Sequence, residues 1–224
     1  MAEVRVATEH RGALLRVTLC APPAERLASA TLRALAAALE AVDAGTKLVV
    51  FDADGDDFSL GGDATPGELH ALFRRLIDIH VPTAAVVRGA CLGAALELAA
   101  FCNFVFASSD ARFGACPLPA FVLPLKLGQG NAEDLVVCGD TLSAAEAYRR
   151  GLVLATAPAS LVGTLSDTWL AAHVLNKTAA SLRRANRVAR AAFHGSLMLH
   201  AAAFDLAASA RAYSASHVPR LHRS

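Results

Sequence analysis

The stretch "GACLGAALELAAFC", residues 89–102, places a single charged residue, Glu97, among small and apolar neighbours. It directly follows "TAAVVRG" (83–89), an apolar segment typical of a buried strand. The order predicts a strand, a glycine-bearing turn and then a helix whose first turn contains Ala94. A buried carboxylate without a partner costs several kcal/mol, or else it stays protonated. Glu97 therefore requires either a structural partner or a chemical role.

Strands and helices alternate through the rest of the chain. The hydrophobic pattern predicts strands at 13–19, 47–53, 103–108 and 152–157, and helices at 29–42, 67–80 and 143–151. Ser143 and Glu146 have the spacing of a capping box at the start of the last of these helices. This alternation is typical of an α/β fold.

The chain from about residue 165 onward has a helical pattern throughout. It is apolar on one side, yet it has too few residues to build a core of its own. We therefore predict one α/β core over residues 1–164 and a helical region over 165–224 that is used in self-association.

Composition excludes several functional classes. Lysine plus arginine (21) nearly balances aspartate plus glutamate (20) among 224 residues, so no global charge attracts nucleic acid or a membrane surface. No apolar run reaches the roughly 20 residues of a membrane-spanning helix, and the charged N-terminus is unlike a signal peptide. These features predict a cytoplasmic protein.

No metal site is expected. The five cysteines lie among apolar neighbours without a C-x-x-C pair, and we predict that they are buried thiols. His70 and His80 bracket a predicted helix without an acidic partner at helical spacing, so they are predicted to be exposed helix residues.

Two glycine-bearing turns each follow a predicted buried strand: "DGDDFSLGGD" (54–63) and "RGACLGAALE" (88–97). Backbone N–H groups at a helix start lack intrahelical acceptors and favour negative charge. One such N–H group from each turn could together hold a developing oxyanion. The alternative is that these turns only need glycine for a positive φ. Neither turn has the pattern of a phosphate-binding loop.

Three segments resemble the enoyl-CoA hydratase/isomerase, or crotonase, family: "FSLGGD" (58–63), "PTAAVVRGACLGAALELAAFCNFVFASSDARFG" (82–114) and "GDTLSAAEAYRRGLV" (139–153). Through "TPGELHALFRRLIDIHVPT" (65–83) the chain is most similar to the alicyclic dienoyl-CoA hydratases of that family. The resemblance implies a spiral of βαβ units with a helical C-terminal region that assembles homotrimers or hexamers. It also implies a lyase or isomerase acting on an acyl-CoA, with no cofactor beyond the coenzyme A of the substrate.

The resemblance also implies the roles of individual residues. The N–H groups of Gly62 and Ala94 would hold the thioester oxygen, and Glu97 would be the acid/base. Ala94 replaces the usual glycine, which keeps a main-chain donor if alanine can adopt the required φ. Lys177, or arginines of "RRANRVAR" (183–190), would contact the coenzyme A phosphates; the alternative for that run is a solvated or intersubunit surface.

One departure from the family weakens the prediction of catalysis. After "ARFG" the family continues "QPE" with a second catalytic glutamate, whereas this chain reads "ACPLPAFVLPLKLGQGNAEDL" (115–135), which is shorter and has no acidic residue before Glu133. Glu97 is then a lone carboxylate, or only a helix-start residue held by neighbouring N–H groups. Hydration, a related decarboxylation, isomerisation or dehydration of an acyl-CoA or acyl-carrier thioester, and binding of acyl-CoA or a partner without catalysis all stay open.

Overall fold

A six-stranded sheet forms the centre of the molecule in the computed structural model, which describes residues 3–20, 26–62, 65–115 and 122–197. The strand order is β1-β2-β3-β4-β6-β9. Only β1 and β2 pair antiparallel; the other neighbours are parallel. The strands are β1 (Val4–Glu9), β2 (Leu14–Leu19), β3 (Leu48–Ala53), β4 (Thr83–Val87), β6 (Phe104–Ser108) and β9 (Ala155–Ala157).

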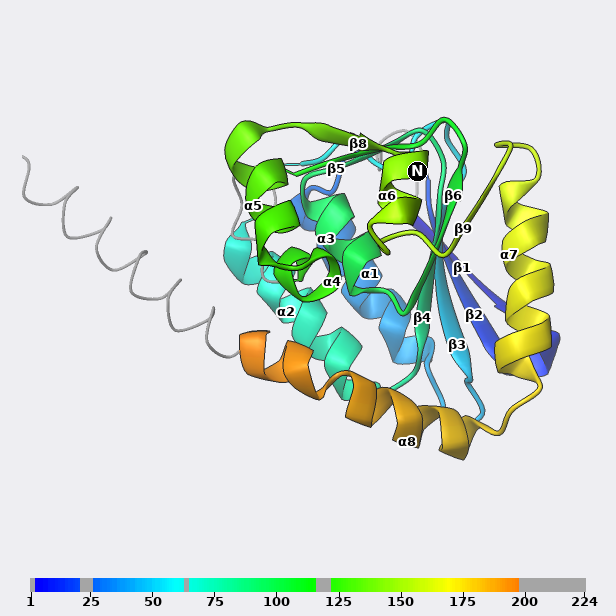
Figure 1. Cartoon of the computed structure of the whole chain (residues 1–224). Helices are drawn as coiled ribbons and strands as arrows, with labels where there is room; N and C mark the ends of the chain where they lie inside the picture. Colours follow the sequence, from blue (N-terminus) through cyan, green and yellow to red (C-terminus); the bar gives the residue numbers. More distant parts are fainter. Residues whose placement is uncertain (1–2, 21–25, 63–64, 116–121, 198–224) are drawn as a thin grey trace, which may run out of the picture.

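Helices cover both faces of this sheet, which explains why its central strands β3 and β4 are buried along nearly their whole length, whereas the edge strand β1 is mostly exposed. One face packs against α1 (Ser29–Ala38), α2 (Pro66–Asp78) and α3 (Ala94–Phe101), and the other against α7 (Val162–Leu170) (Figure 1). Along β3 the side chains alternate between the two cores: Val49 and Phe51 enter the first, Leu48 and Val50 the second. The predicted α/β class and the strand at 47–53 are confirmed.

A second, three-stranded sheet lies beyond the carboxyl ends of β4 and β6 (Figure 1). It contains β5 (Ala90–Leu92), β7 (Arg112–Gly114) and β8 (Thr141–Ser143). The prediction that residues 89–102 form only a turn and a helix was therefore wrong at its start, because residues 90–92 form a strand. Three residues are too few to show a strand period in the sequence.

Three further helices complete the first layer: α4 (Leu123–Leu127), α5 (Gln129–Cys138) and α6 (Ala144–Arg149). The predicted capping box at α6 is confirmed. Ser143 Oγ accepts from the Glu146 N–H, and the Glu146 carboxylate accepts from the Ser143 N–H at 2.9 Å.

The helical pattern expected from residue 165 is confirmed as far as the described residues extend. It comprises α7, a π-helical turn η3 (Ala171–Leu175), α8 (Ala179–Ala189) and helical residues 191–197; residues 198–224 lie outside the described part. Leu170, Val174 and Leu182 pack into the core on the second face of the sheet. Part of the apolar side of these helices is thus used within the chain, and the division between residues 164 and 165 stays a prediction. Self-association through this region stays a prediction.

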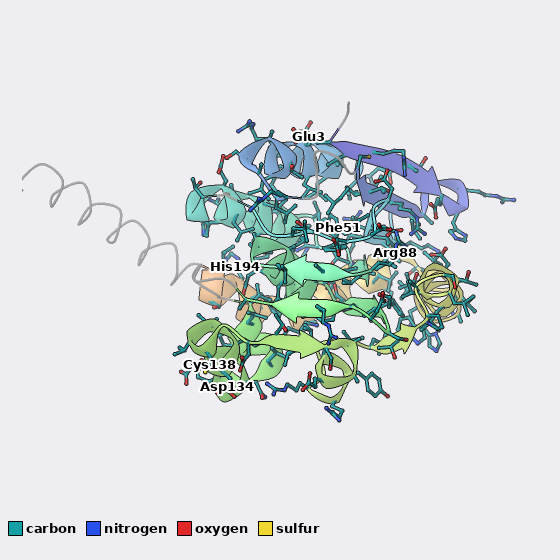
Figure 2. The ribbon with its side chains drawn as sticks, turned by 90° about the horizontal axis from the view of Figure 1, so that it is seen from above. Glu3, Phe51, Arg88, Asp134, Cys138 and His194 are labelled. Atoms are coloured by element: carbon teal, nitrogen blue, oxygen red, sulfur yellow. The ribbon has the colours of Figure 1, made fainter. Side chains whose placement is uncertain are left out.

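Two predictions about polar residues need correction. Cys138 is exposed, because the last turn of α5 faces solvent; Figure 2 shows it at the periphery beside Asp134. Cys20 is only partly buried, Cys91 and Cys102 are buried as predicted, and Cys116 lies outside the described residues. His70 and His80 are partly buried instead of exposed, because α2 packs closely on its neighbours.

The described residues contain no group of three or more His, Cys, Asp or Glu side chains that could hold a metal ion. None of the helices in these ranges is long and apolar enough to cross a membrane.

Candidate active site

The two glycine-bearing turns run side by side. Ser59 and Cys91 pair in an isolated parallel bridge, and the Ser59 N–H donates to the Ala90 carbonyl at 2.9 Å. This pairing brings the two turns together, and Gly62 and Ala94 each lie three residues beyond it along their own segments. Both turns follow the carboxyl ends of neighbouring parallel strands, β3 and β4.

Glycine is required at two positions of the first turn, for different reasons. Gly61 has a φ of +87°, which favours glycine. A Cβ added at Gly61 would lie 3.6 Å from the Leu92 carbonyl oxygen. Gly62 has no positive φ, but a Cβ there would lie 2.1 Å from the Leu27 carbonyl oxygen. The Leu27 N–H also donates to the Gly61 carbonyl at 2.8 Å. The turn is therefore held between two main-chain segments, and its glycines serve close packing as well as φ.

Ala94 begins α3. The positive φ of this turn, +61°, falls on Gly93 at the N-cap, so the alanine after it has helical backbone angles. Alanine in place of the usual glycine is compatible with this geometry and keeps the N–H donor. Among the described residues, neither the Gly62 nor the Ala94 N–H donates a backbone hydrogen bond outside its own element. The dipole of α3 favours negative charge at this end.

Glu97 lies in the first turn of α3, a helix in which every residue is buried, and its side chain belongs to a residue only 3% exposed. Its Oε2 accepts a hydrogen bond from the Val122 N–H at 3.0 Å. One donor to this carboxylate thus comes from a segment 25 residues further along the chain. Val122 directly precedes α4.

Lys177 is far from these groups within one chain. Its ammonium contacts the His173 carbonyl in η3, and the Lys47 ammonium at the start of β3 binds the Leu175 carbonyl of the same turn. Lys177 therefore belongs to the segment held beside the start of β3, whereas the turns that carry Gly62 and Ala94 follow the opposite ends of β3 and β4.

The basic run 183–190 is divided between two roles. Arg183 donates to the Ile79 carbonyl at 2.8 Å, which attaches α8 to the loop after α2. Arg190 is buried, stacks on the Phe101 ring at 4.3 Å and donates to Asn103 Oδ1 at 2.8 Å. Burial lowers the pKa of Arg190 to about 10. The solvated surface predicted for this run is therefore limited to its exposed members, which include Arg184 and Arg187.

Two groups near the site were not found from the sequence. The Val122 N–H is a main-chain donor and leaves no residue-type signal. Lys126 lies one turn further along α4, partly buried, where burial and, secondarily, the charge of Arg190 lower its pKa to about 8. Its position between leucines in "PLKLG" (124–128) was the signal that could have identified it.

The arrangement suits one kind of chemistry. The two paired turns carry the main-chain N–H groups of Gly62 and Ala94, and a carboxylate follows Ala94 by three residues along α3, about 4.5 Å at the rise of an α-helix. Paired donors stabilise negative charge on a carbonyl oxygen, while a nearby carboxylate can move a proton at an adjacent carbon or water.

Comparison with known proteins gives the family of the chain. A family model described as enoyl-CoA hydratase/isomerase matches residues 9–215. The chain is 35% identical over 207 residues to cyclohexa-1,5-dienecarbonyl-CoA hydratase of Thauera aromatica, covering 84% of this chain and 80% of that protein. It is 31% identical over 184 residues to 2,3-dehydroadipyl-CoA hydratase of Escherichia coli K12, covering 72% and 71%.

Solved structures share the fold. An enoyl-CoA hydratase/isomerase from Pseudoalteromonas atlantica T6c superposes with a TM-score of 0.79 at 26% identity, over 88% of this chain and 86% of that one. An enoyl-CoA hydratase from Mycobacterium avium has a TM-score of 0.79 at 24% identity, over 97% and 100%.

Proposed function

Because the chain belongs to the enoyl-CoA hydratase/isomerase family, and has the crotonase-type fold of its solved members, we propose that it hydrates an unsaturated, alicyclic acyl-CoA. In this proposal the Gly62 and Ala94 N–H groups hold the thioester oxygen, and Glu97 is the acid/base. The observation that supports it most is the pairing of Ser59 with Cys91, which brings the two turns side by side, together with the burial of Glu97 in the helix that follows the second turn.

The proposed reaction begins with polarisation of the thioester. Hydrogen bonds to the carbonyl oxygen draw electrons from the conjugated double bond, so water can attack the far carbon of the conjugated system. Glu97 takes one proton from that water, the hydroxide forms the new C–O bond, and the π electrons move to the thioester oxygen as an enolate. Glu97 then returns the proton to carbon as the enolate collapses. Water is added overall, and one carboxyl group carries the proton both ways.

The substrate class comes from the relatives. The Thauera aromatica protein is named for a cyclohexadiene carbonyl-CoA and the Escherichia coli protein for an unsaturated acyl-CoA. The greater identity and coverage of the first favour an alicyclic acyl group. The proposal further includes action in the cytoplasm, assembly as a homotrimer or hexamer, and coenzyme A of the substrate as the only cofactor.

A second candidate follows from the segment after β7. The sequence has no acidic residue between Gly114 and Glu133, and Glu133 is exposed and bonded to Gln129. A site with one carboxylate fits double-bond isomerisation or decarboxylation of an acyl-CoA or acyl-carrier thioester, each of which needs only one proton-transfer group. It also fits a protein that binds acyl-CoA without turning it over.

Mass spectrometry after incubation with a panel of thioesters tests these alternatives. The panel contains cyclohexa-1,5-dienecarbonyl-CoA, 2,3-dehydroadipyl-CoA, crotonyl-CoA and a malonyl-type thioester. Gain of one water on the alicyclic substrate supports the proposal; loss of carbon dioxide, or deuterium uptake from D₂O without hydration, supports the second candidate. Calorimetric binding without any conversion supports the non-catalytic alternative. If no thioester is converted or bound, both proposals fail.

A further inference from the structure

We infer that the main-chain N–H of Val122 is the positioning group for Glu97: it orients the buried carboxylate, and it favours the charged form of Glu97 relative to the same site without this donor. The inference rests on the proposed function and names how this site operates without a second carboxylate.

The contact is well defined. The Val122 nitrogen lies 3.0 Å from Glu97 Oε2, Val122 is fully buried and Glu97 nearly so, at 3% exposed. A hydrogen bond between buried groups is not weakened by competing water, so it fixes the carboxylate more firmly than the same bond at the surface.

The donor is itself fixed by α4. The Val122 carbonyl accepts from the Leu125 N–H at 3.0 Å and from the Lys126 N–H at 3.1 Å, and Val122 has helical backbone angles (φ −89°, ψ −41°). Leu123 and Leu127 anchor the same helix in the core at 1% and 6% exposed. The position of the N–H therefore depends on the packing of α4 and not on a flexible side chain.

The chemical group beside Glu97 determines whether the charged or the neutral form of this carboxyl group is favoured. A second carboxylate beside Glu97 would favour protonation of one of the two groups, because like charges at short distance disfavour joint ionisation. An N–H donor has the opposite effect, because it stabilises the charged form. Segment 115–135, which in the family carries the second glutamate, thus presents a main-chain donor to Glu97 in this chain.

An amide-to-ester exchange at position 122 removes this donor and leaves the side chain intact. The α-hydroxy analogue of valine, introduced at a suppressed stop codon, replaces the N–H by an oxygen. We expect kcat on the alicyclic acyl-CoA to fall roughly 10- to 100-fold, the value of one hydrogen bond to a charged group, with KM nearly unchanged. The acid limb of the kcat/KM profile should move about one pH unit or more upward, because the carboxylate loses a group that stabilises its charge.

The matched control is the same exchange at Ala132, whose N–H donates to the Gly128 carbonyl at 3.2 Å at the start of α5. It removes a helix hydrogen bond in which neither Glu97 nor Val122 takes part. We expect the control ester protein to lose a similar amount of stability, while the acid limb of its kcat/KM profile stays at the pH found for the wild type. Equal shifts in both ester proteins would mean that the effect is only structural, and would overturn the inference.

A titration of the wild-type protein tests the contact independently of turnover and of any variant's folding. The ¹H chemical shift of the Val122 amide should change with pH at one midpoint, which also appears in the ¹³C shift of the Glu97 carboxyl. An amide shift that does not follow the carboxyl overturns the inference even if hydration is observed. Conversely, coupled titration in a protein that converts no thioester supports the positioning contact while the proposed function fails.

Discussion

Glu97 is the residue on which the proposed chemistry depends, and it can be altered with little change of shape. In Glu97→Gln the amide oxygen can still accept from the Val122 N–H, so the fold and thioester binding should be retained. Turnover should fall by roughly 10² to 10⁴, the usual contribution of a positioned proton-transfer group. Steady-state kinetics and calorimetric binding of the thioester measure the two effects separately.

Glu133→Gln is the matched control, because Glu133 is exposed and bonds only to the nearby Gln129 among its described contacts. It should leave turnover unchanged. Full activity of Glu97→Gln with a loss of only about 1 kcal/mol of stability would show that Glu97 is a structural residue. The proposed mechanism would then keep only the two N–H donors.

Gly62 combines a main-chain role with a lack of space. In Gly62→Ala the new Cβ would lie 2.1 Å from the Leu27 carbonyl oxygen, so the turn must move and its N–H with it. We expect kcat/KM to fall about 10² to 10³, as when one oxyanion donor is lost, and the free energy of unfolding to drop by about 1 to 3 kcal/mol. Kinetics and urea unfolding give the two values.

Gly130→Ala provides the contrast. Gly130 lies in α5, and no atom lies within 4 Å of the place where its Cβ would stand. Alanine there should stabilise the protein by about 0.5 to 1 kcal/mol without affecting kinetics. Similar losses in both variants would contradict the role assigned to Gly62.

Lys126 makes the stability depend on pH. Burial, with a smaller contribution from Arg190, lowers the pKa of Lys126 from its ordinary 10.5 to about 8. Between these values the unfolded chain binds more protons than the folded one, so stability rises with pH across this window. Below pH 8 the full cost of the buried charge is present. Lys126→Met should therefore unfold with a free energy about 1 to 2 kcal/mol higher at pH 7, and the gain should shrink toward pH 10.5.

Urea unfolding of both proteins at pH 7 and pH 9.5 measures this change. Lys177→Met replaces an exposed lysine and should give no comparable gain at either pH. A gain for Lys126→Met that is the same at both pH values would show that packing and not charge is responsible.

At the scale of elements, α8 and the helical turns after it are attached to the body by arginine. Arg190 lies 4.3 Å from the Phe101 ring and 4.6 Å from the Phe193 ring, and it donates to Asn103. A lysine keeps the charge but cannot stack as a plane or reach two partners at once. Arg190→Lys should cost about 1 to 3 kcal/mol and speed amide hydrogen exchange in residues 179–197. Arg184→Lys, at an exposed position of the same helix, should change neither measurement.

At the scale of the whole molecule, we predict that the chain self-associates through its C-terminal helices as a homotrimer or hexamer. Val188 on α8 is 76% exposed, an apolar side chain that a neighbouring subunit could cover. Analytical ultracentrifugation at micromolar concentration should show the assembly, and Val188→Asp should weaken it, because a carboxylate buried at an interface costs several kcal/mol.

Val137 on α5 is 81% exposed and serves as the control. Val137→Asp should leave the assembly intact. A monomeric wild type would contradict the prediction. If Val137→Asp dissociates the assembly and Val188→Asp does not, the interface involves α5 and not α8.

Most of the large elements could be predicted from the sequence, because each has a local physical cause. A continuous apolar run gives β3, and the Ser143–Glu146 box fixes the start of α6. The three strands of the small sheet could not be predicted, because each has three residues and exists only through its partners. The exposure of Cys138 depends on which side of α5 meets the core, and a lone cysteine in an apolar run does not reveal that.

The sequence by itself determined which residues are candidates for the site: Gly62, Ala94 and Glu97 lie in short local motifs that can be recognised without a structure. Only the tertiary structure decided how they meet. The parallel pairing of Ser59 with Cys91 and the bond from Val122 to Glu97 join segments 32 and 25 residues apart. Such contacts form between main-chain groups that every residue carries, so their register depends on how the sheet and helices pack and not on residue type.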